Sequence, residues 1–240
     1  MAKKENNTIH PESHRSSHIA KLNWLRAAVL GGNDGIVSIA GLVVGVAGAT
    51  NSHAAILTAG IAGIVSATIS MAAGEYVSVS SSRDTEKALL KKEKYELEHY
   101  PEQELEELAG LYEERGLSRK TAEIVAKELT EKDPYKAHID AELGIDPNNL
   151  TNPWHAAFAS AAAFISGGSI PLAAILLTPE SIRIPVTFVS VIIALAVTGT
   201  LSAKAGGADP LRASARVVVG GALAMIVTYG VGRLFGVVGL

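Results

Sequence analysis

The sequence has no cysteine among its 240 residues, and only 19% of its residues are charged. The absence of cysteine excludes disulfides, thiolate metal sites and cysteine nucleophiles. A soluble globular protein usually carries about 25% charged residues, so this chain has few with which to cover a soluble surface. It also lacks a phosphate-binding Gly-rich loop and a nucleophile–base arrangement, so neither ATP-driven transport nor catalysis is indicated. We expect no enzymatic activity and no nucleic-acid partner.

Five long apolar runs fill most of the remaining sequence. Each is long enough to form a helix across the hydrocarbon core of a membrane, which takes about 20 residues. None shows the polar stripe, repeating every 3.6 residues, that marks a surface helix of a soluble protein. Buried helices of a large soluble protein are the alternative, but the chain has too little polar sequence to cover five of them. The runs, called spans below, cover residues 25–49, 54–80, 154–177, 185–203 and 213–238.

The charged residues predict how the chain is oriented and divided. Lys and Arg precede the first span and follow the second, whereas the link between these two spans has neither. Because cytoplasmic flanks are rich in Lys and Arg, the N-terminus and the segment after the second span are expected in the cytoplasm. That segment holds 11 basic and 18 acidic residues. The predicted divisions are a polar tail without a signal peptide (1–22), two spans (23–80), an acidic cytoplasmic insert (81–150) and three spans (151–240).

The insert is predicted to be helical throughout. The helix of the second span continues to about Tyr100, where Pro101 interrupts it. Another helix covers residues 101–115, and a third begins after Ser118, which has the character of an N-cap. A short turn over residues 135–143 follows. The fold class is therefore all-α: a polytopic membrane protein with five transmembrane helices and a three-helix cytoplasmic insert between the second and third.

Glycines recur along the first span at a spacing that favours close helix packing. Gly31 with Gly35, and Gly41 with Gly45, have the G-x-x-x-G pattern that lets helix backbones approach in lipid. Two interpretations remain open: packing within one chain, or a seam between two copies.

Asp34 is the most informative residue of the first span. It lies about 9 residues into the span, or about 14 Å at 1.5 Å per residue, near the middle of the membrane. A carboxylate there costs at least about 2.5–3.5 kcal/mol, so it is expected to face a cavity, a partner or an ion path. The alternative is that Asp34 caps a broken helix beside Gly35. Asn33 could supply a carbonyl oxygen to the same ion.

Two residues of the second span extend this prediction. Met71 is expected at about the depth of Asp34, and Glu75 one turn nearer the cytoplasm on the same face. A thioether and a carboxylate are plausible ligands for a borderline divalent ion, although Met71 alone would more often be a packing residue. With Asp34, these residues predict a row of ligands leading inward from the cytoplasm.

The insert contains a second set of candidate ligands. Its carboxylates come in pairs three residues apart, so each pair shares a helical face, and one histidine–glutamate pair follows at a spacing of four. Oxygen ligands with one imidazole suit Fe²⁺, Mn²⁺, Co²⁺ or Zn²⁺ better than Cu⁺. An acidic solvated face is the alternative, because glutamate is abundant here. The candidates are Glu93, Glu96, Glu104, Glu107, His138 and Glu142, with Glu98, Glu102, Glu106, Glu113 and Glu114 as substitutes.

A ferritin-like di-iron oxidase fits the sequence poorly. Its site needs two Glu-x-x-His motifs on separate helices, and this chain has one, Glu96 to His99.

Three motifs make the chain resemble the vacuolar iron transporter family. They are RAAVLGGNDGIVS over residues 26–38, SMAAGEYVSV over residues 70–79 and NPWHAA over residues 152–157. The resemblance extends over nearly the whole chain beyond the tail. It implies five spans, a homodimer with the ion path between subunits, a cytoplasmic metal-binding insert, and exchange of metal for protons out of the cytosol.

The resemblance also assigns roles to residues. It implies path roles for Asp34, Met71 and Glu75, and ligand roles for a set of insert glutamates. Eukaryotic members of the family have a methionine pair in the last insert segment, where this chain has His138 and Ile139. The metal preference is therefore open. The implied insert ligands are Glu93, Glu96, Glu104, Glu107 and Glu142.

These observations predict a proton-coupled Fe²⁺ transporter that moves metal out of the cytosol. One alternative is a broader efflux protein for Mn²⁺, Co²⁺ and Zn²⁺, and another is a membrane metal sensor or scaffold that transports nothing. A third, an intramembrane enzyme, is disfavoured because Asp34 has no second carboxylate at matched depth. The expected partners are lipid, divalent metal ions as substrate, protons and a second copy of the chain, with no cofactor. A prokaryotic plasma membrane, or a vacuolar membrane in a eukaryote, is the expected location.

Overall fold

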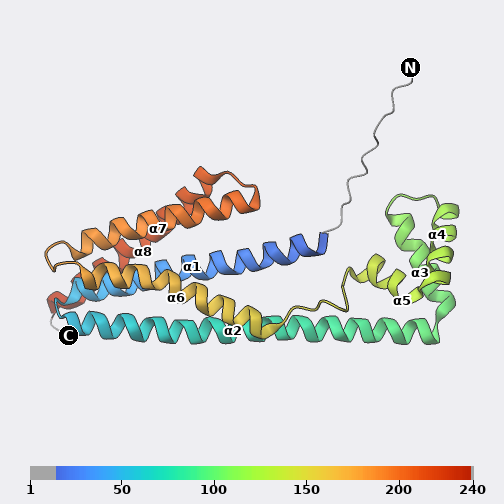
Figure 1. Ribbon diagram of the computed structural model, residues 1–240, viewed down its shortest axis with the longest axis horizontal. Helices are drawn as coiled ribbons and strands as arrows, with labels where there is room; N and C mark the ends of the chain where they lie inside the picture. Colours follow the sequence, from blue (N-terminus) through green and yellow to red (C-terminus); the bar gives the residue numbers. More distant parts are fainter. Residues whose placement is uncertain (1–14, 239–240) are drawn as a thin grey trace, which may run out of the picture. The chain divides into compact units, whose positions relative to one another are not determined.

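The computed structural model describes the backbone from Arg15 to Val238 and the side chains from Val29 to Gly236 (Figure 1). Every regular element in this part of the chain is a helix, which confirms that the fold is all-α. Five helices are long and apolar enough to cross a membrane. They are α1 (Arg15–Ala49), α2 (His53–His99), α6 (Pro153–Leu177), α7 (Arg183–Gly206) and α8 (Pro210–Val238). Helix α1 thus begins inside the predicted tail, whose residues 1–14 lie outside the described residues.

The described chain divides into two compact units. One combines the residues up to Gly74 with those from Ala156 onward, and the other is Glu75–His155. The first unit contains α1, the start of α2, and α6, α7 and α8. The second contains the rest of α2 and the short helices of the insert. These are α3 (Pro101–Glu114), α4 (Arg119–Lys132), α5 (Pro134–His138) and the π-helix η1 (Ile139–Leu143).

Helix α7 shows why no span has a polar stripe. Its inward face repeats every four residues with buried side chains that include Val191 and Leu195. Its outward face repeats in the same way with Val189, Ile193 and Val197, each more than half exposed. A surface helix in water would place charged residues on that outward face. Apolar residues on both faces are what a helix between protein and lipid requires.

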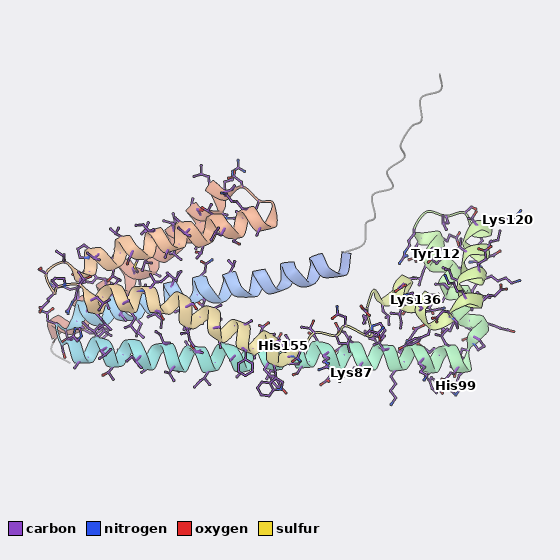
Figure 2. The ribbon with its side chains drawn as sticks, in the orientation of Figure 1. Lys87, His99, Tyr112, Lys120, Lys136 and His155 are labelled. Carbon is purple, nitrogen blue, oxygen red and sulfur yellow. The ribbon has the colours of Figure 1, made fainter. Side chains whose placement is uncertain are left out.

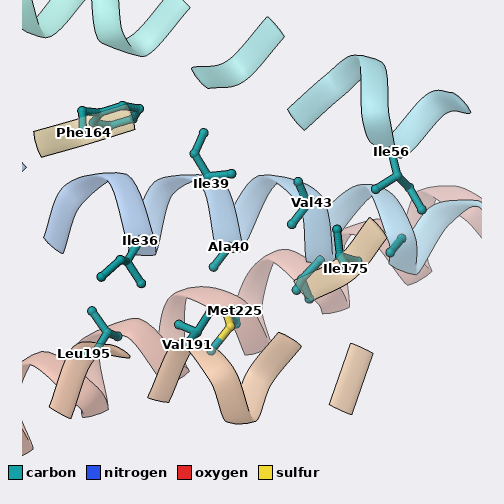
Figure 3. Close-up of a cluster of buried hydrophobic side chains, with 12 residues drawn as sticks. Ile36, Ile39, Ala40, Val43, Ile56, Phe164, Ile175, Val191, Leu195 and Met225 are labelled. Atoms are coloured by element: carbon teal, nitrogen blue, oxygen red, sulfur yellow. The ribbon is translucent and has the colours of Figure 1, made fainter. Parts of the chain in front are cut away.

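A continuous hydrophobic core joins the helices of the first unit. Helix α1 supplies Ile36, Ile39 and Val43, each no more than 1% exposed (Figure 3). Phe164 of α6 and Met225 of α8 are fully buried against the same cluster. Helix α1 also packs against α7 and α8. Helix α1 is therefore central to this unit, and its orientation determines where Asp34 points.

The glycines of α1 are used for packing within the chain. A Cβ atom added at Gly35 would overlap the carbonyl oxygen of Phe164 and lie 2.9 Å from the backbone nitrogen of Gly168 in α6. On the other side, a Cβ atom added at Gly45 would lie 3.2 Å from the carbonyl oxygen of Thr228 in α8. Of the two interpretations left open for the glycine pairs, packing within one chain is confirmed. This close approach needs residues without side chains.

Arg183, at the start of α7, is buried and fixes the link between α1 and α2. Its guanidinium donates to the carbonyl oxygens of Thr50 and Asn51, at 3.3 and 3.4 Å, and to the side-chain oxygen of Asn51 at 3.2 Å. The positive charge thereby lies beside carbonyl groups that follow the end of α1, where the helix dipole favours a cation.

The insert helices begin and end close to the expected residues. Ser118 caps α4, because its hydroxyl accepts from the backbone N–H of Thr121. Asp133 caps α5 by accepting from the N–H of Lys136 at 3.0 Å. The core between α3, α4, α5 and η1 contains Leu108 and four buried alanines, whose small side chains let the helices approach closely. Tyr112, Lys120 and Lys136 mark α3, α4 and α5 in Figure 2.

Candidate metal centre and ion-path residues

Three predicted ligands meet at a buried centre in the insert. They come from three different helices: Glu93 from α2, Glu104 from α3 and His138 from the end of α5. His138 Nδ1 lies 3.0 Å from Glu93 Oε1 and 3.6 Å from Glu104 Oε2. One possible ligand atom from each residue lies within 4.8 Å of the other two. We call these three residues the inner triad.

The inner triad leaves polar atoms unsatisfied. His138 is 0% exposed, and neither of its ring nitrogens has a hydrogen-bond partner among the described residues. Glu93 Oε1 is likewise buried and has no hydrogen-bond partner. It lies 3.0 Å from His138 Nδ1, but the two atoms do not have hydrogen-bond geometry. Such atoms each cost about 1–3 kcal/mol and are rare in native proteins. A cation bound between the carboxylates and the imidazole would satisfy them.

Burial changes the acidity of each residue of the inner triad. Burial first, and then the nearby charge of Glu142, raises the pKa of Glu93 to about 8. Burial followed by the charge of Glu107 raises the pKa of Glu104. Burial also lowers the pKa of His138, against a smaller opposing effect of Glu142. Without a metal ion, Glu93 therefore keeps its proton at neutral pH and His138 is neutral.

The other three predicted ligands surround the inner triad. Glu142, in the π-helix η1, acts on Glu93 through its charge and through a side-chain hydrogen bond. Glu107 and Glu96 are close enough to Glu104 to raise its pKa. Glu96 itself pairs with Lys92 at 2.7 Å. We call Glu96, Glu107 and Glu142 the outer carboxylates. Three of the six predicted ligands therefore meet at the buried triad, and the charges of the other three act on its carboxyl groups.

Two groups of residues fall outside this centre. Arg119 binds the substitute ligands Glu106 and Glu113, and it also pairs with Glu123 at 2.7 Å. His99, of the Glu-x-x-His motif, stacks on Tyr95 with ring centroids 3.9 Å apart at the exposed end of α2 (Figure 2). The carboxylates bound by Arg119 serve to hold α3 against α4. Sequence reasoning missed Lys92, although its spacing of four from Glu96 was a readable signal.

Asp34 lies on a face of α1 that the other described helices leave open. The exposed residues Leu30, Asp34 and Ser38 follow one another at a spacing of four. Asp34 accepts a hydrogen bond from Ser38 Oγ at 3.1 Å. Helix α1 is unbroken at this point, so the alternative in which Asp34 caps a broken helix is wrong. A carboxylate on the outer face of a membrane helix still needs water, a partner or an ion.

The remaining path candidates are placed differently. The side-chain oxygen of Asn33 accepts from Thr198 Oγ1 of α7 at 2.5 Å, so in this structure Asn33 is engaged away from Asp34. Met71 is half-buried and packs against the core cluster of the first unit, as the packing alternative also expects. Glu75 is half-buried on α2. The path roles of Asn33, Met71 and Glu75 stay predictions.

Comparison with known proteins adds independent evidence. A family model described as the VIT family matches residues 25–233. A vacuolar iron transporter of Acanthamoeba castellanii is 45% identical over 228 residues, covering 94% of this chain and 84% of that protein. Vacuolar iron transporter homolog 1 of Oryza sativa subsp. japonica is 36% identical over 225 residues, which cover 93% of this chain and 79% of that protein. Vacuolar iron transporter homolog 2 of Arabidopsis thaliana is 36% identical over 236 residues, which cover 98% of this chain and 96% of that protein.

Proposed function

Because this chain belongs to the VIT family, we propose that it is a multi-pass membrane transporter that moves Fe²⁺ out of the cytosol in exchange for protons. The resemblance carried by the motifs of the first two spans is confirmed by the family match. Relatives named as vacuolar iron transporters support iron as the substrate. The direction of transport, out of the cytosol, and its coupling to protons are proposed in addition. We place the insert in the cytosol, with a prokaryotic plasma membrane, or a vacuolar membrane in a eukaryote, as the location.

The observation that carries the proposal is the open position of Asp34 in an apolar helix. A carboxylate that no other described helix covers, held only by Ser38, is available to a divalent cation or to a proton. Alternate binding of the two at one group couples their movements, because each must leave before the other can bind. Acid on the far side would protonate the carboxylate and release the metal.

A second copy of the chain is the proposed neighbour of this face. The exposed residues Leu30, Asp34 and Ser38 form a mixed polar and apolar stripe, which suits a protein seam better than lipid. Two such stripes facing each other would place two Asp34 carboxylates at one ion path.

The insert is proposed to collect the ion before transport. Its inner triad and outer carboxylates offer one imidazole and five carboxyl groups within a single chain. That ligand set suits a divalent transition metal better than it suits Cu⁺.

The proposal is tested by metal flux in proteoliposomes with an imposed pH gradient. The wild-type protein should move Fe²⁺ only when the gradient is present, and Asp34→Asn should reduce flux to that of empty vesicles while the insert still binds metal. Glu128→Gln, at an exposed position of α4, removes the same charge and should leave flux unchanged. Full Fe²⁺ transport by the Asp34→Asn variant would reject the assigned path.

The same vesicles separate the alternative functions. Competition among Fe²⁺, Mn²⁺, Co²⁺ and Zn²⁺ distinguishes an iron transporter from a broader efflux protein. Metal binding without flux of any of these ions would identify a sensor or scaffold instead.

A further inference from the structure

His138 is the one nitrogen donor at the inner triad, and its position is defined by the local fold. The Asp133 cap and Pro134 start α5, and His138 is the last residue of that helix before η1. Its ring is fully buried, with Nδ1 directed at Glu93 Oε1 and Glu104 Oε2. A histidine that serves only the core would normally satisfy at least one ring nitrogen with a hydrogen bond. Neither nitrogen of His138 has a hydrogen-bond partner within the described part of the chain, although Nδ1 lies close to both carboxyl groups.

We propose that His138 determines which ions the insert accepts, by selecting divalent ions that bind imidazole well (Fe²⁺, Co²⁺, Ni²⁺ and Zn²⁺) over Mg²⁺, Ca²⁺ and Mn²⁺. This inference rests on the proposed function only for the statement that the bound ion is cargo. The selectivity itself is a property of the three side chains.

The geometry disfavours the hard ions for two reasons. An ion at the inner triad must give up water for one nitrogen and two carboxylate groups in a buried site. Mg²⁺ loses its water reluctantly, and Ca²⁺ requires six to eight oxygen ligands, so both ions are expected to bind weakly at the inner triad. Glu96, Glu107 and Glu142, which could add oxygen ligands, are half-buried or exposed rather than buried with the triad.

Among transition metals, the imidazole favours the later members of the series. Affinity for a mixed nitrogen and oxygen site increases from Mn²⁺ through Fe²⁺ and Co²⁺ to Ni²⁺, and Zn²⁺ also binds imidazole well. A site made only of carboxylates would discriminate less between Mn²⁺ and Co²⁺. The nitrogen of His138 is therefore expected to set the difference in affinity between these two ions.

The test compares Co²⁺, Zn²⁺, Mn²⁺ and Ca²⁺ binding to the full chain in detergent, measured by calorimetric titration. His138→Gln keeps a polar side chain of similar size but removes the nitrogen donor. It should weaken Co²⁺ and Zn²⁺ binding by about 10- to 100-fold and change Mn²⁺ and Ca²⁺ binding by less than about threefold. His99→Gln, which alters an exposed histidine on the same unit, should change none of these affinities. Equal losses for all four ions would overturn the selectivity proposal.

A second measurement leaves the buried residue unchanged, in case His138→Gln does not fold. The chain has seven histidines, and a variant that keeps His138 as its single histidine gives ring-nitrogen NMR signals from that residue alone. One equivalent of Zn²⁺ should shift the Nδ1 signal, whereas an equal amount of Ca²⁺ should leave it in place. No shift with Zn²⁺ would overturn the proposal even if vesicles of the wild-type protein transport Fe²⁺. A shift without transport would instead reject the proposed function and leave the selectivity standing.

Discussion

Glu93 is a carboxyl group that carries a proton at neutral pH in the absence of metal. Its pKa of about 8 lies above its ordinary value because it is buried and because Glu142 lies near it. A metal ion binds the ionised form, so the ion must displace this proton when it binds at neutral pH. The neutral ring of His138, whose pKa is lowered by burial, has no proton to lose at pH 7.

Metal affinity of the insert should therefore increase with pH. Below about pH 8 the protonated fraction of Glu93 falls as pH rises, so affinity should increase by up to about tenfold per pH unit and then level off. Calorimetric titration with Co²⁺ in buffers of different ionisation enthalpy measures the number of protons released. About one is expected at pH 7 for the wild-type chain and fewer for Glu93→Gln. Binding that is independent of pH from 6 to 8 would contradict this account of Glu93.

Lys92 places a positively charged ammonium group beside the outer carboxylates. Its ammonium group lies 2.7 Å from Glu96, and the hydrogen bond with Glu96, together with the charges of Glu142 and Glu107, raises its pKa. It therefore repels a divalent ion that approaches the same carboxylates.

Replacement of Lys92 by methionine should strengthen metal binding to the insert. We expect Lys92→Met to increase Co²⁺ affinity by roughly 3- to 10-fold, because one unit of positive charge is removed at close range in a solvated setting. Lys91→Met removes the same charge from the preceding, exposed residue and should have a smaller effect. Equal effects of the two variants in the same titration would show that only net charge matters, and not the contact with Glu96.

Spacing in the sequence predicted which carboxylates share a helical face but not which of them are buried. Glu93 and Glu96, three residues apart, were correctly expected on one side of α2, and Glu104 with Glu107 on one side of α3. Which member of each pair is buried depends on how α3, α4 and η1 pack beside the end of α2, and spacing does not contain that information. The burial of His138 depends in the same way on the angle at Pro134.

At the scale of the helices, α1 and α6 pack closely at Gly35 of α1 and Gly168 of α6. Gly35 faces Phe164 and Gly168 so closely that a methyl group has no room. Gly35→Ala should therefore separate the helices locally and destabilise the fold by about 1–3 kcal/mol. The loss should be visible as a lower thermal midpoint in detergent. Gly74→Ala is the matched control, because an added Cβ there would meet no described atom within 4 Å. If both variants melted at the wild-type temperature, close packing of α1 against α6 at Gly35 would not contribute to stability as proposed.

The helices themselves were predictable, and their irregular ends were less so. Length and apolar composition suffice to find a membrane span, and Pro101 and Ser118 mark helix boundaries through their own chemistry. The π-helix η1 was expected only as a turn, because five residues are too few for periodicity to distinguish helix types. The helical start at Arg15 also lies inside the segment expected to be a tail, since polar residues can extend a helix beyond the apolar run.

For the whole molecule, the face of α1 that carries Asp34 is proposed to meet a second copy. The absence of cysteine makes this directly testable, because a single introduced cysteine has no competitor. Leu30→Cys, on that face, should form a cross-linked dimer in membranes treated with a mild oxidant. Val189→Cys, on the exposed outward face of α7, should stay largely monomeric. Cross-linking at Val189 but not at Leu30 would place the seam elsewhere.

The architecture of the molecule was readable from its sequence because the bilayer imposes it. Backbone polar groups must be paired within each crossing, so an apolar run long enough to cross can only be a helix here. The family motifs were readable for a different reason, since Asp34 and Glu75 are costly residues to keep in a span. How two copies meet was not readable, because a residue facing a partner and a residue facing lipid can have the same neighbours along the chain.

Helix α2 has 47 residues in one unbroken run, which at 1.5 Å per residue is about 70 Å. That is more than twice the roughly 30 Å of hydrocarbon in a bilayer, so over half of this helix must stand in water or head groups.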